Sequence, residues 1–255
     1  MTEETKTFWS HLEDLRWCLF RVVVVLLVGV IGGFIAMPYL FEHFVMAPTT
    51  SDFVLYRWLA ATGLFPQMAA DTFAVEIINI KLASQFTTHI STSFWLALMV
   101  AFPYLVYEIW RFISPALYQH ERKSVSVAFL AGTVMFFLGC AVGYLLVFPL
   151  TFRFLAEYQL STTIANQIAL HSYMSNFLGM IFIMGLVFEL PLMTWLLSSL
   201  GVVNRGMLGE FRRYAVVALL VLSAFITPSG DPFTLMVVFL PLYLLYEAGI
   251  LVAKR

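Results

Sequence analysis

Residues 172–199, SYMSNFLGMIFIMGLVFELPLMTWLLSS, form an apolar stretch whose single charged residue is Glu189. A spanning helix needs about 20 predominantly apolar residues, so this stretch predicts a membrane span. A carboxylate inside the hydrocarbon costs about 2.5–3.5 kcal/mol on insertion scales. Glu189 is therefore predicted to be a functional residue, whose charge is satisfied by a polar partner or by water.

The composition extends this interpretation to the whole chain. Of its 255 residues, 61% are hydrophobic and 11% are charged, against about 25% charged in an ordinary soluble domain. The net charge is −1 and no basic run occurs, so no nucleic-acid partner is expected. No cysteine has neighbours at metal-ligand spacing, and neither a metal nor a cofactor is predicted. We expect an all-α integral membrane protein formed by one polytopic domain, 1–255.

Six apolar segments predict six transmembrane helices. The fifth is short, because the 14 residues between Arg213 and Pro228 would give a helix of about 21 Å against a hydrocarbon core of about 30 Å. Either the bilayer thins there or the span is incomplete. The predicted spans are about 17–38, 89–110, 124–149, 172–199, 214–227 and 232–252.

The lysines and arginines predict the orientation. With the N-terminus in the cytoplasm, three basic residues lie outside, namely Arg57, Lys81 and Arg153. All the others lie inside: Lys6, Arg16, Arg21, Arg111, Arg122, Lys123, Arg205, Arg212, Arg213, Lys254 and Arg255. This asymmetry follows the positive-inside rule and places both termini in the cytoplasm.

Prolines shape the expected architecture. Pro103, Pro149, Pro191 and Pro241 each fall in a predicted span, and proline bends a helix because it lacks a backbone donor. We therefore expect a cupped, concave bundle; the uneven proline spacing predicts no internal repeat. The outside loop, 39–88, mixes acids with many aromatics and predicts short amphipathic helices on the membrane face.

Two GxxxG motifs predict close helix contacts. Gly29 with Gly33, and Gly139 with Gly143, place small residues one turn apart on a helix face. Packing within the chain is the expected role, and dimerisation is the alternative.

Polar motifs stand at the span ends. SHLEDLR, 10–16, puts Asp14 and Arg16 at the cytoplasmic mouth of the first span. RFISPALYQHERK, 111–123, sets Glu121 among basic side chains in the loop between the second and third spans. Guanidinium groups form bidentate, charge-assisted pairs with such carboxylates.

The turn TPSGDP, 227–232, precedes the last span and holds Asp231. An acid in such a turn is predicted to cap a helix or to stabilise the turn itself. Together with F-E-L-P around Glu189, these motifs in this order resemble the TatC family, the receptor subunits of the twin-arginine protein translocase. The resemblance covers essentially the whole chain. The chain is also similar to the family in length and in its predicted six-span, N-in topology.

The resemblance implies a function. TatC proteins bind the Arg-Arg pair of signal peptides on folded cargo at the cytoplasmic face. They recruit the single-span subunits TatB and TatA in an oligomeric complex of the prokaryotic inner membrane, and the proton-motive force drives export. By resemblance the signal-peptide-binding residues are Asp14, Glu121, Arg16, His120, Arg122, Phe112, Pro115 and Tyr118. Glu189 would meet a polar group of a partner helix, while Pro48 and Asp231 match positions of the outer loops.

Some residues depart from the family pattern. Asp14 stands where glutamate is usual, which shortens its reach by one methylene. Cys18 stands where a further basic residue is common, and Leu235 where glutamine is common.

Two other classes of protein are the alternatives. A secondary transporter or channel for a small solute would show paired broken helices and several polar groups at the midplane, whereas Glu189 alone is predicted to lie deep in the membrane. An enzyme is not expected, because no base stands beside a nucleophile.

Overall fold

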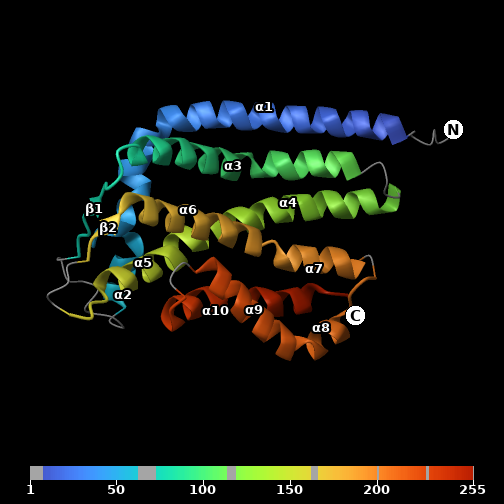
Figure 1. The fold of residues 1–255 in the computed structure, drawn as a ribbon. Helices are drawn as coiled ribbons and strands as arrows, with labels where there is room; N and C mark the ends of the chain where they lie inside the picture. Colours follow the sequence, from blue (N-terminus) through green and yellow to red (C-terminus); the bar gives the residue numbers. More distant parts are fainter. Residues whose placement is uncertain are drawn as a thin grey trace. The chain divides into compact units, whose positions relative to one another are not determined.

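The computed structural model describes residues 8–62, 73–113, 119–161, 166–199, 201–227 and 230–254. This part of the chain is helical apart from short loops and two strands of two residues each (Figure 1). The chain divides into two compact units. The first comprises Met1–Met37 and His89–Thr133, and the second comprises Pro38–Thr88 and Val134–Arg255.

Helices account for most of the described residues. The longer ones are α1 (Phe8–Leu40), α3 (Ser84–Ile113), α4 (Gln119–Val142), α5 (Phe148–Glu157), α6 (Leu170–Val187), α7 (Leu190–Ser199), α9 (Arg212–Ile226) and α10 (Pro232–Val252). Shorter elements are α2 (Val54–Ala61), α8 (Arg205–Glu210), the π-helical turns η1 (Phe41–Val45) and η5 (Gly143–Val147), and the 3-10 turn η2 (Ala47–Thr49).

Among the described residues, five helical segments are long and apolar enough to cross a membrane: Leu12–Thr49, Ser84–Ile109, Phe129–Glu157, Leu170–Ser199 and Pro232–Val252. They correspond to five of the six predicted spans. The sixth, 214–227, falls on α9, whose 15 residues extend about 22 Å at 1.5 Å per residue. The shortness of this segment is confirmed, and the count of six crossings stays a prediction.

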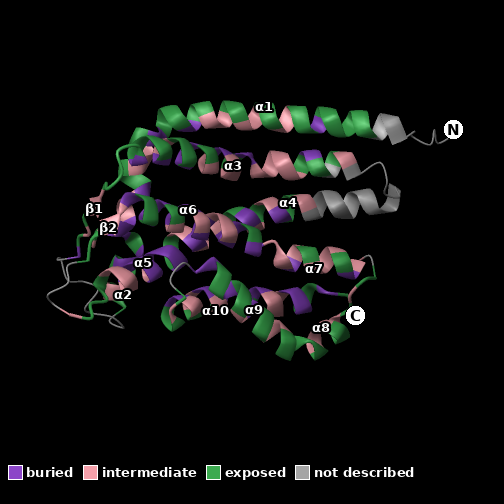
Figure 2. Cartoon of the chain, viewed as in Figure 1, coloured by how far each residue is buried: buried purple, intermediate pink, exposed green. Residues whose placement is uncertain are grey.

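Apolar side chains cover the outside of the helices. Along α1 most residues are exposed (Figure 2), and Val28, Ile31 and Ile35 are 62–76% exposed. Exposing such a continuous apolar surface to water would be unfavourable, whereas contact with lipid tails is not, because the tails are as apolar as these side chains. The described helices therefore have the surface of a multi-pass membrane protein.

The prolines act in different ways. The helix is interrupted at Phe188 and Glu189, directly before Pro191 in the first turn of α7. The π-helical turn η5 comes immediately before α5, which has Pro149 in its first turn. Pro103 and Pro241 lie inside continuous helices. The missing proline donor is thus accommodated by a break at one site and by a wider turn at another, while the cupped arrangement stays a prediction.

In the first unit, α1 and α3 lie side by side (Figure 1). A Cβ on Gly29 would lie 3.0 Å from the Ala97 Cβ, and one on Gly33 would lie 3.2 Å from the Ser93 carbonyl oxygen. Both glycines therefore allow the two backbones to approach.

The second unit uses its GxxxG motif in the same way. A Cβ on Gly139 would lie 2.5 Å from the Met184 carbonyl oxygen, and one on Gly143 would lie 3.0 Å from the Ile181 Cα. The end of α4 and η5 thus pack directly on α6, while α10 packs on α7 and α9. Close packing within the chain, the predicted role of both GxxxG motifs, is confirmed.

The outside loop, 39–88, forms α2 as one of the short helices expected there. A pairing that the sequence did not predict joins this loop to a distant one. Strand β1 (Ile77–Ile78) pairs in parallel with β2 (Ile168–Ala169), with Ile77 opposite Ile168.

Tyr56 of α2 anchors this loop. It is fully buried, and its hydroxyl lies 3.2 Å from the Pro48 carbonyl oxygen and 3.0 Å from that of Pro149. The guanidinium of Arg153, which is 3% exposed, lies 4.9 Å from the centre of the Tyr56 ring and 4.7 Å from that of Phe73. Burial raises the pKa of Tyr56, so its hydroxyl stays protonated and remains a donor.

Candidate functional site

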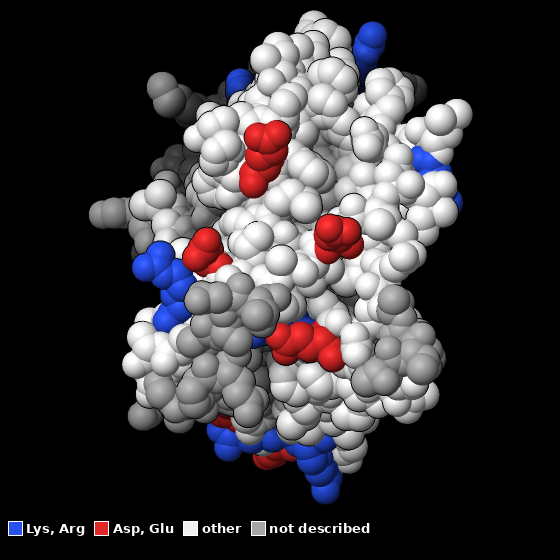
Figure 3. Space-filling model, turned by 90° about the vertical axis from the view of Figure 1, so that its left-hand side faces the viewer, with Lys and Arg blue, Asp and Glu red and all other residues white. Residues whose placement is uncertain are grey.

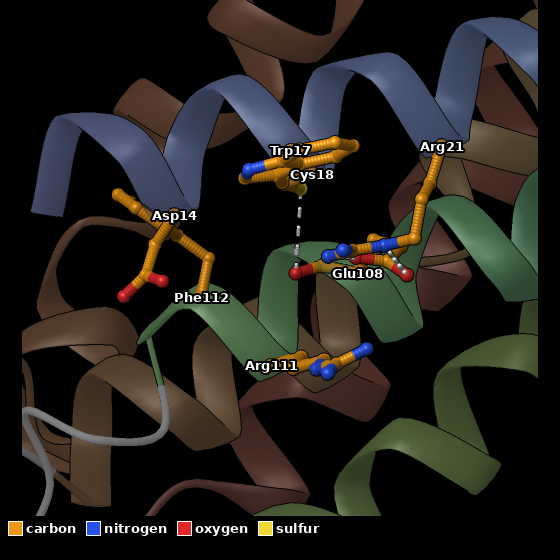
Figure 4. Close-up of a pocket in the computed structure, with 7 residues that line it drawn as sticks. All are labelled: Asp14, Trp17, Cys18, Arg21, Glu108, Arg111 and Phe112. Carbon is orange, nitrogen blue, oxygen red and sulfur yellow. Dashed lines mark hydrogen bonds and ion pairs between the residues drawn. The ribbon is translucent and has the colours of Figure 1, made fainter. Parts of the chain in front are cut away.

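A pocket of about 290 Å³ is formed by α1 and α3 within the first unit (Figure 4). Residues three, four and seven apart share one helix face, and each helix contributes such a set. The pocket is lined by Asp14, Trp17, Cys18 and Arg21 of α1, and by Glu108, Arg111 and Phe112 of α3. Two acids and two arginines therefore face the same space.

An ion pair dominates one end of the pocket. Arg21 Nε donates to Glu108 Oε1 at 2.9 Å, and Arg21 Nη2 donates to Glu108 Oε2 at 2.7 Å. This is the two-pronged geometry that makes arginine–carboxylate pairs strong and directional. The Glu108 side chain is 2% exposed, whereas that of Arg21 is 35% exposed. Arg21 therefore neutralises a buried carboxylate.

Neighbouring groups hold Glu108 in place. The hydroxyl of Tyr104, one helical turn earlier on α3, donates to Glu108 Oε1 at 2.8 Å. Cys18, which is buried, places its Sγ 3.7 Å from the Glu108 carbonyl oxygen. The cysteine thus fills the contact between the two helices as a small apolar side chain.

Asp14 and Phe112 lie at the other end of the pocket (Figure 4). Both belong to the set predicted from the sequence. Arg16 is exposed on α1 and is not among the residues that line the pocket.

The rest of the predicted set cannot be placed beside these two. Pro115 and Tyr118 lie outside the described residues. His120, Glu121 and Arg122 lie in the first turn of α4, and their side chains are outside the described part of the structure.

Sequence reasoning missed the Arg21–Glu108 pair. Both residues carry charge inside candidate spans, so the interpretation that only Glu189 stands out within the membrane was incomplete. A signal was present, since Tyr104 and Glu108 are four residues apart in a helix, which places a donor beside a carboxylate. The partner on α1 could not be chosen without knowing which helices are neighbours.

Glu189 occupies the break between α6 and α7. Its backbone N–H donates to the Leu186 carbonyl oxygen at 3.1 Å, and its own carbonyl accepts from the Met193 N–H at 2.9 Å. The side chain is half-buried, and its Oε1 is buried without a hydrogen-bond partner among the described residues. A buried unsatisfied carboxylate oxygen is unfavourable, which suits a position that meets a donor from another molecule.

Asp231 caps α10, as predicted. Its Oδ1 accepts from the Thr234 N–H at 2.8 Å, and its Oδ2 accepts from the Thr234 hydroxyl at 2.5 Å. Pro232 follows at the first helical position, where proline is favoured. Pro48, the other outer-loop residue of the predicted set, is buried in η2.

On the face drawn in Figure 3, the charged side chains of the described residues are spread over a mostly uncharged surface. The charged pocket of the first unit is thus the better candidate for a charged ligand.

The long apolar helices, the charged pocket at one end of α1 and α3, and the carboxylate inside a candidate span define a multi-pass α-helical membrane protein. A family model described as Sec-independent protein translocase protein (TatC) matches residues 10–241. The chain belongs to the TatC family and is a component of a protein translocase.

Relatives and solved structures agree with this assignment. The TatC protein of Deinococcus radiodurans is 35% identical, over 96% of this chain and 85% of the relative. That of Haemophilus influenzae is 33% identical, over 99% of this chain and 90% of the relative. A crystal structure described as the twin arginine translocase receptor TatC in DDM has a TM-score of 0.75 at 29% identity, and the match covers 96% of this chain and 100% of that one.

Proposed function

We propose that this chain is the receptor of the translocase and binds the Arg-Arg pair of signal peptides in the pocket formed by α1 and α3. The observation that carries this proposal is Asp14, which lines the pocket beside Phe112. Glu121, at the start of α4, is proposed as the second acid. Arg16, Pro115, Tyr118, His120 and Arg122 are proposed to shape the same site.

The chemistry favours arginine over lysine. A guanidinium presents a planar fork of donors that matches a carboxylate, whereas an ammonium acts as a point charge. Two acids can therefore distinguish a pair of arginines from a single one. Binding alone is proposed, without a catalytic step.

The proposed orientation places this pocket at the cytoplasmic face of the inner membrane. The pocket lies at the N-terminal end of α1 and the C-terminal end of α3. Both ends are on the side to which the positive-inside rule assigns the excess of lysine and arginine. Signal peptides made in the cytoplasm would then reach it directly.

The test is photocrosslinking of a synthetic peptide, with an Arg-Arg pair followed by an apolar segment, to the purified protein. Asp14→Ala and Glu121→Ala are each expected to abolish the crosslink, and Lys-Lys in the peptide to weaken it. Glu13→Ala is the matched control, because Glu13 is an exposed acid next to Asp14 that does not line the pocket. Unchanged crosslinking in both site variants would remove the assignment.

We also propose that Glu189 contacts a polar group on a transmembrane helix of TatB or TatA. Its buried Oε1, which has no hydrogen-bond partner in the described part of the chain, supports this proposal. Glu189→Ala is expected to lose crosslinking to the partner helix and to lose export, while Glu189→Gln, which keeps a hydrogen-bonding side chain, retains part of both. Normal export and crosslinking in Glu189→Ala, with intact membrane insertion, would refute the contact.

A further inference from the structure

The same arrangement, a glutamate held by a tyrosine one helical turn earlier and by an arginine of another helix, occurs twice in the described part of this protein. Y-L-V-Y-E, 104–108, lies on α3, and Y-L-L-Y-E, 243–247, lies on α10. In each, the first tyrosine donates to the glutamate and an arginine of another helix pairs with that glutamate: Tyr104 and Arg21 with Glu108, and Tyr243 and Arg212 with Glu247.

The two copies differ in their surroundings. Glu108 is 2% exposed and lines the pocket, whereas Glu247 is 28% exposed and its arginine is 53% exposed. Glu247 is not among the residues that line the pocket. One copy therefore places a buried carboxylate, paired with a partly exposed guanidinium, where an arginine of a ligand is proposed to bind.

A buried carboxylate is strongly destabilising when its partner is removed and nothing replaces it. Exchange of one guanidinium for another avoids this penalty, because the two-pronged geometry and the charge are kept. The Tyr104 hydroxyl can go on donating to Glu108 during such an exchange. Arg21 itself is 35% exposed, and its long side chain can reach toward water when it is released.

We propose that Glu108 is a further arginine-binding carboxylate of this pocket, and that Arg21 masks it until an arginine of the signal peptide takes its place. The inference rests on the proposed function. Asp14 and Arg21 are seven residues apart on α1, about 10.5 Å along the helix axis at 1.5 Å per residue. The pocket is thus long enough to offer two separate anchoring points, one at Asp14 and one at Glu108.

Exchange also gives a reason for specificity. A lysine that displaced Arg21 would leave part of the Glu108 carboxylate without a donor, because an ammonium cannot reproduce both prongs of the fork. The internal arginine therefore sets a threshold that a second arginine can meet and a lysine cannot.

The experiment measures binding of the fluorescent Arg-Arg peptide to the full-length protein in detergent by anisotropy. Four proteins form a cycle: the wild type, Arg21→Gln, Glu108→Gln and the double variant. Arg212→Gln is the matched control, because it breaks the same kind of pair and removes the same charge outside the pocket. Thermal unfolding of each variant checks its folding.

Arg21→Gln is expected to tighten binding about tenfold or more, the range of a charge-assisted hydrogen bond, because the peptide no longer competes with Arg21. The gain should vanish in the double variant, Glu108→Gln alone should weaken binding, and the control should bind like the wild type. Arg21→Lys keeps the charge, and it should also tighten binding, which covers the case in which Arg21→Gln does not fold.

Unchanged or weaker binding in Arg21→Gln and Arg21→Lys would overturn the inference, and so would a gain that persists without Glu108. These results are distinct from failure of the proposed function. If Asp14→Ala abolishes binding while the cycle shows no gain, the pair is structural and the receptor assignment stands. If Asp14→Ala and Glu121→Ala both bind normally, the receptor assignment itself fails.

Discussion

Gly139→Ala is expected to destabilise the protein, because this glycine has no room for a side chain. A Cβ there would lie 2.5 Å from the Met184 carbonyl oxygen and 2.8 Å from the Phe188 Cβ. The first of these atoms is backbone, so relief requires α4 or α6 to move. Overpacking of a filled core typically costs about 1–3 kcal/mol, and the higher helix propensity of alanine offsets up to about 1 kcal/mol.

Because the nearest atom is backbone, the upper end of the overpacking cost applies, and we expect a net loss of about 2 kcal/mol, which is roughly a thirtyfold change in the ratio of folded to unfolded protein. The assay is unfolding in mixed detergent micelles with increasing SDS, followed by far-UV circular dichroism. Gly32→Ala is the matched control, because an added Cβ there would meet no other described residue within 4 Å beyond its own chain neighbours and the adjacent backbone of α1. If the two variants have the same free energy of unfolding, the close approach of α4 and α6 at Gly139 is wrong.

Substitutions at three further positions, Asp231, Tyr56 and Arg153, can be measured by the same unfolding assay. Asp231→Ala should lower the free energy of unfolding by about 1 kcal/mol through loss of the cap on α10, while Asp231→Asn keeps most of it; equal losses would contradict the capping role. Tyr56→Phe should cost about 1–3 kcal/mol, because buried carbonyls lose a donor. The wild type should also lose stability above about pH 10, the ordinary pKa of tyrosine, since the unfolded phenol ionises first when the folded pKa is raised; the part of this loss due to Tyr56 should be absent from Tyr56→Phe. Arg153→Met should cost about 1–2 kcal/mol, because it removes both ring contacts and the hydrogen-bonded ion pair of Arg153 Nε with Glu157 Oε1 at 2.9 Å; a neutral effect would show that these contacts together contribute little.

Much of the architecture could be predicted because membrane spans leave a strong signal. The lengths of the apolar segments predicted the spans and showed that 214–227 is too short for a full span, since both depend only on the number of consecutive apolar residues. The cap at Asp231 was also predictable, because capping involves residues close in the chain. The contact partners of Gly139 could not be predicted. The GxxxG motif predicts a close helix contact, but it does not show which helix the glycines face.

The candidate site was predictable in part, because short motifs near the span ends resemble those of the TatC family. Asp14 and Phe112 were identified from motifs and line one pocket. Glu108 was overlooked, because counting charges by side of the membrane treats Arg21 as one more inside cation and not as half of a pair. Two-residue strands such as β1 are too short for any alternation to be recognised, so the pairing of the outer loops left no usable pattern.

That strand pairing has a consequence for biosynthesis. Ile77 pairs with Ile168, far downstream in the chain, so β1 stays without its partner strand until the ribosome has made the later loop. In the predicted orientation that loop must also cross the bilayer. A nascent chain halted before Ile168 would therefore leave β1 unpaired and accessible to proteases.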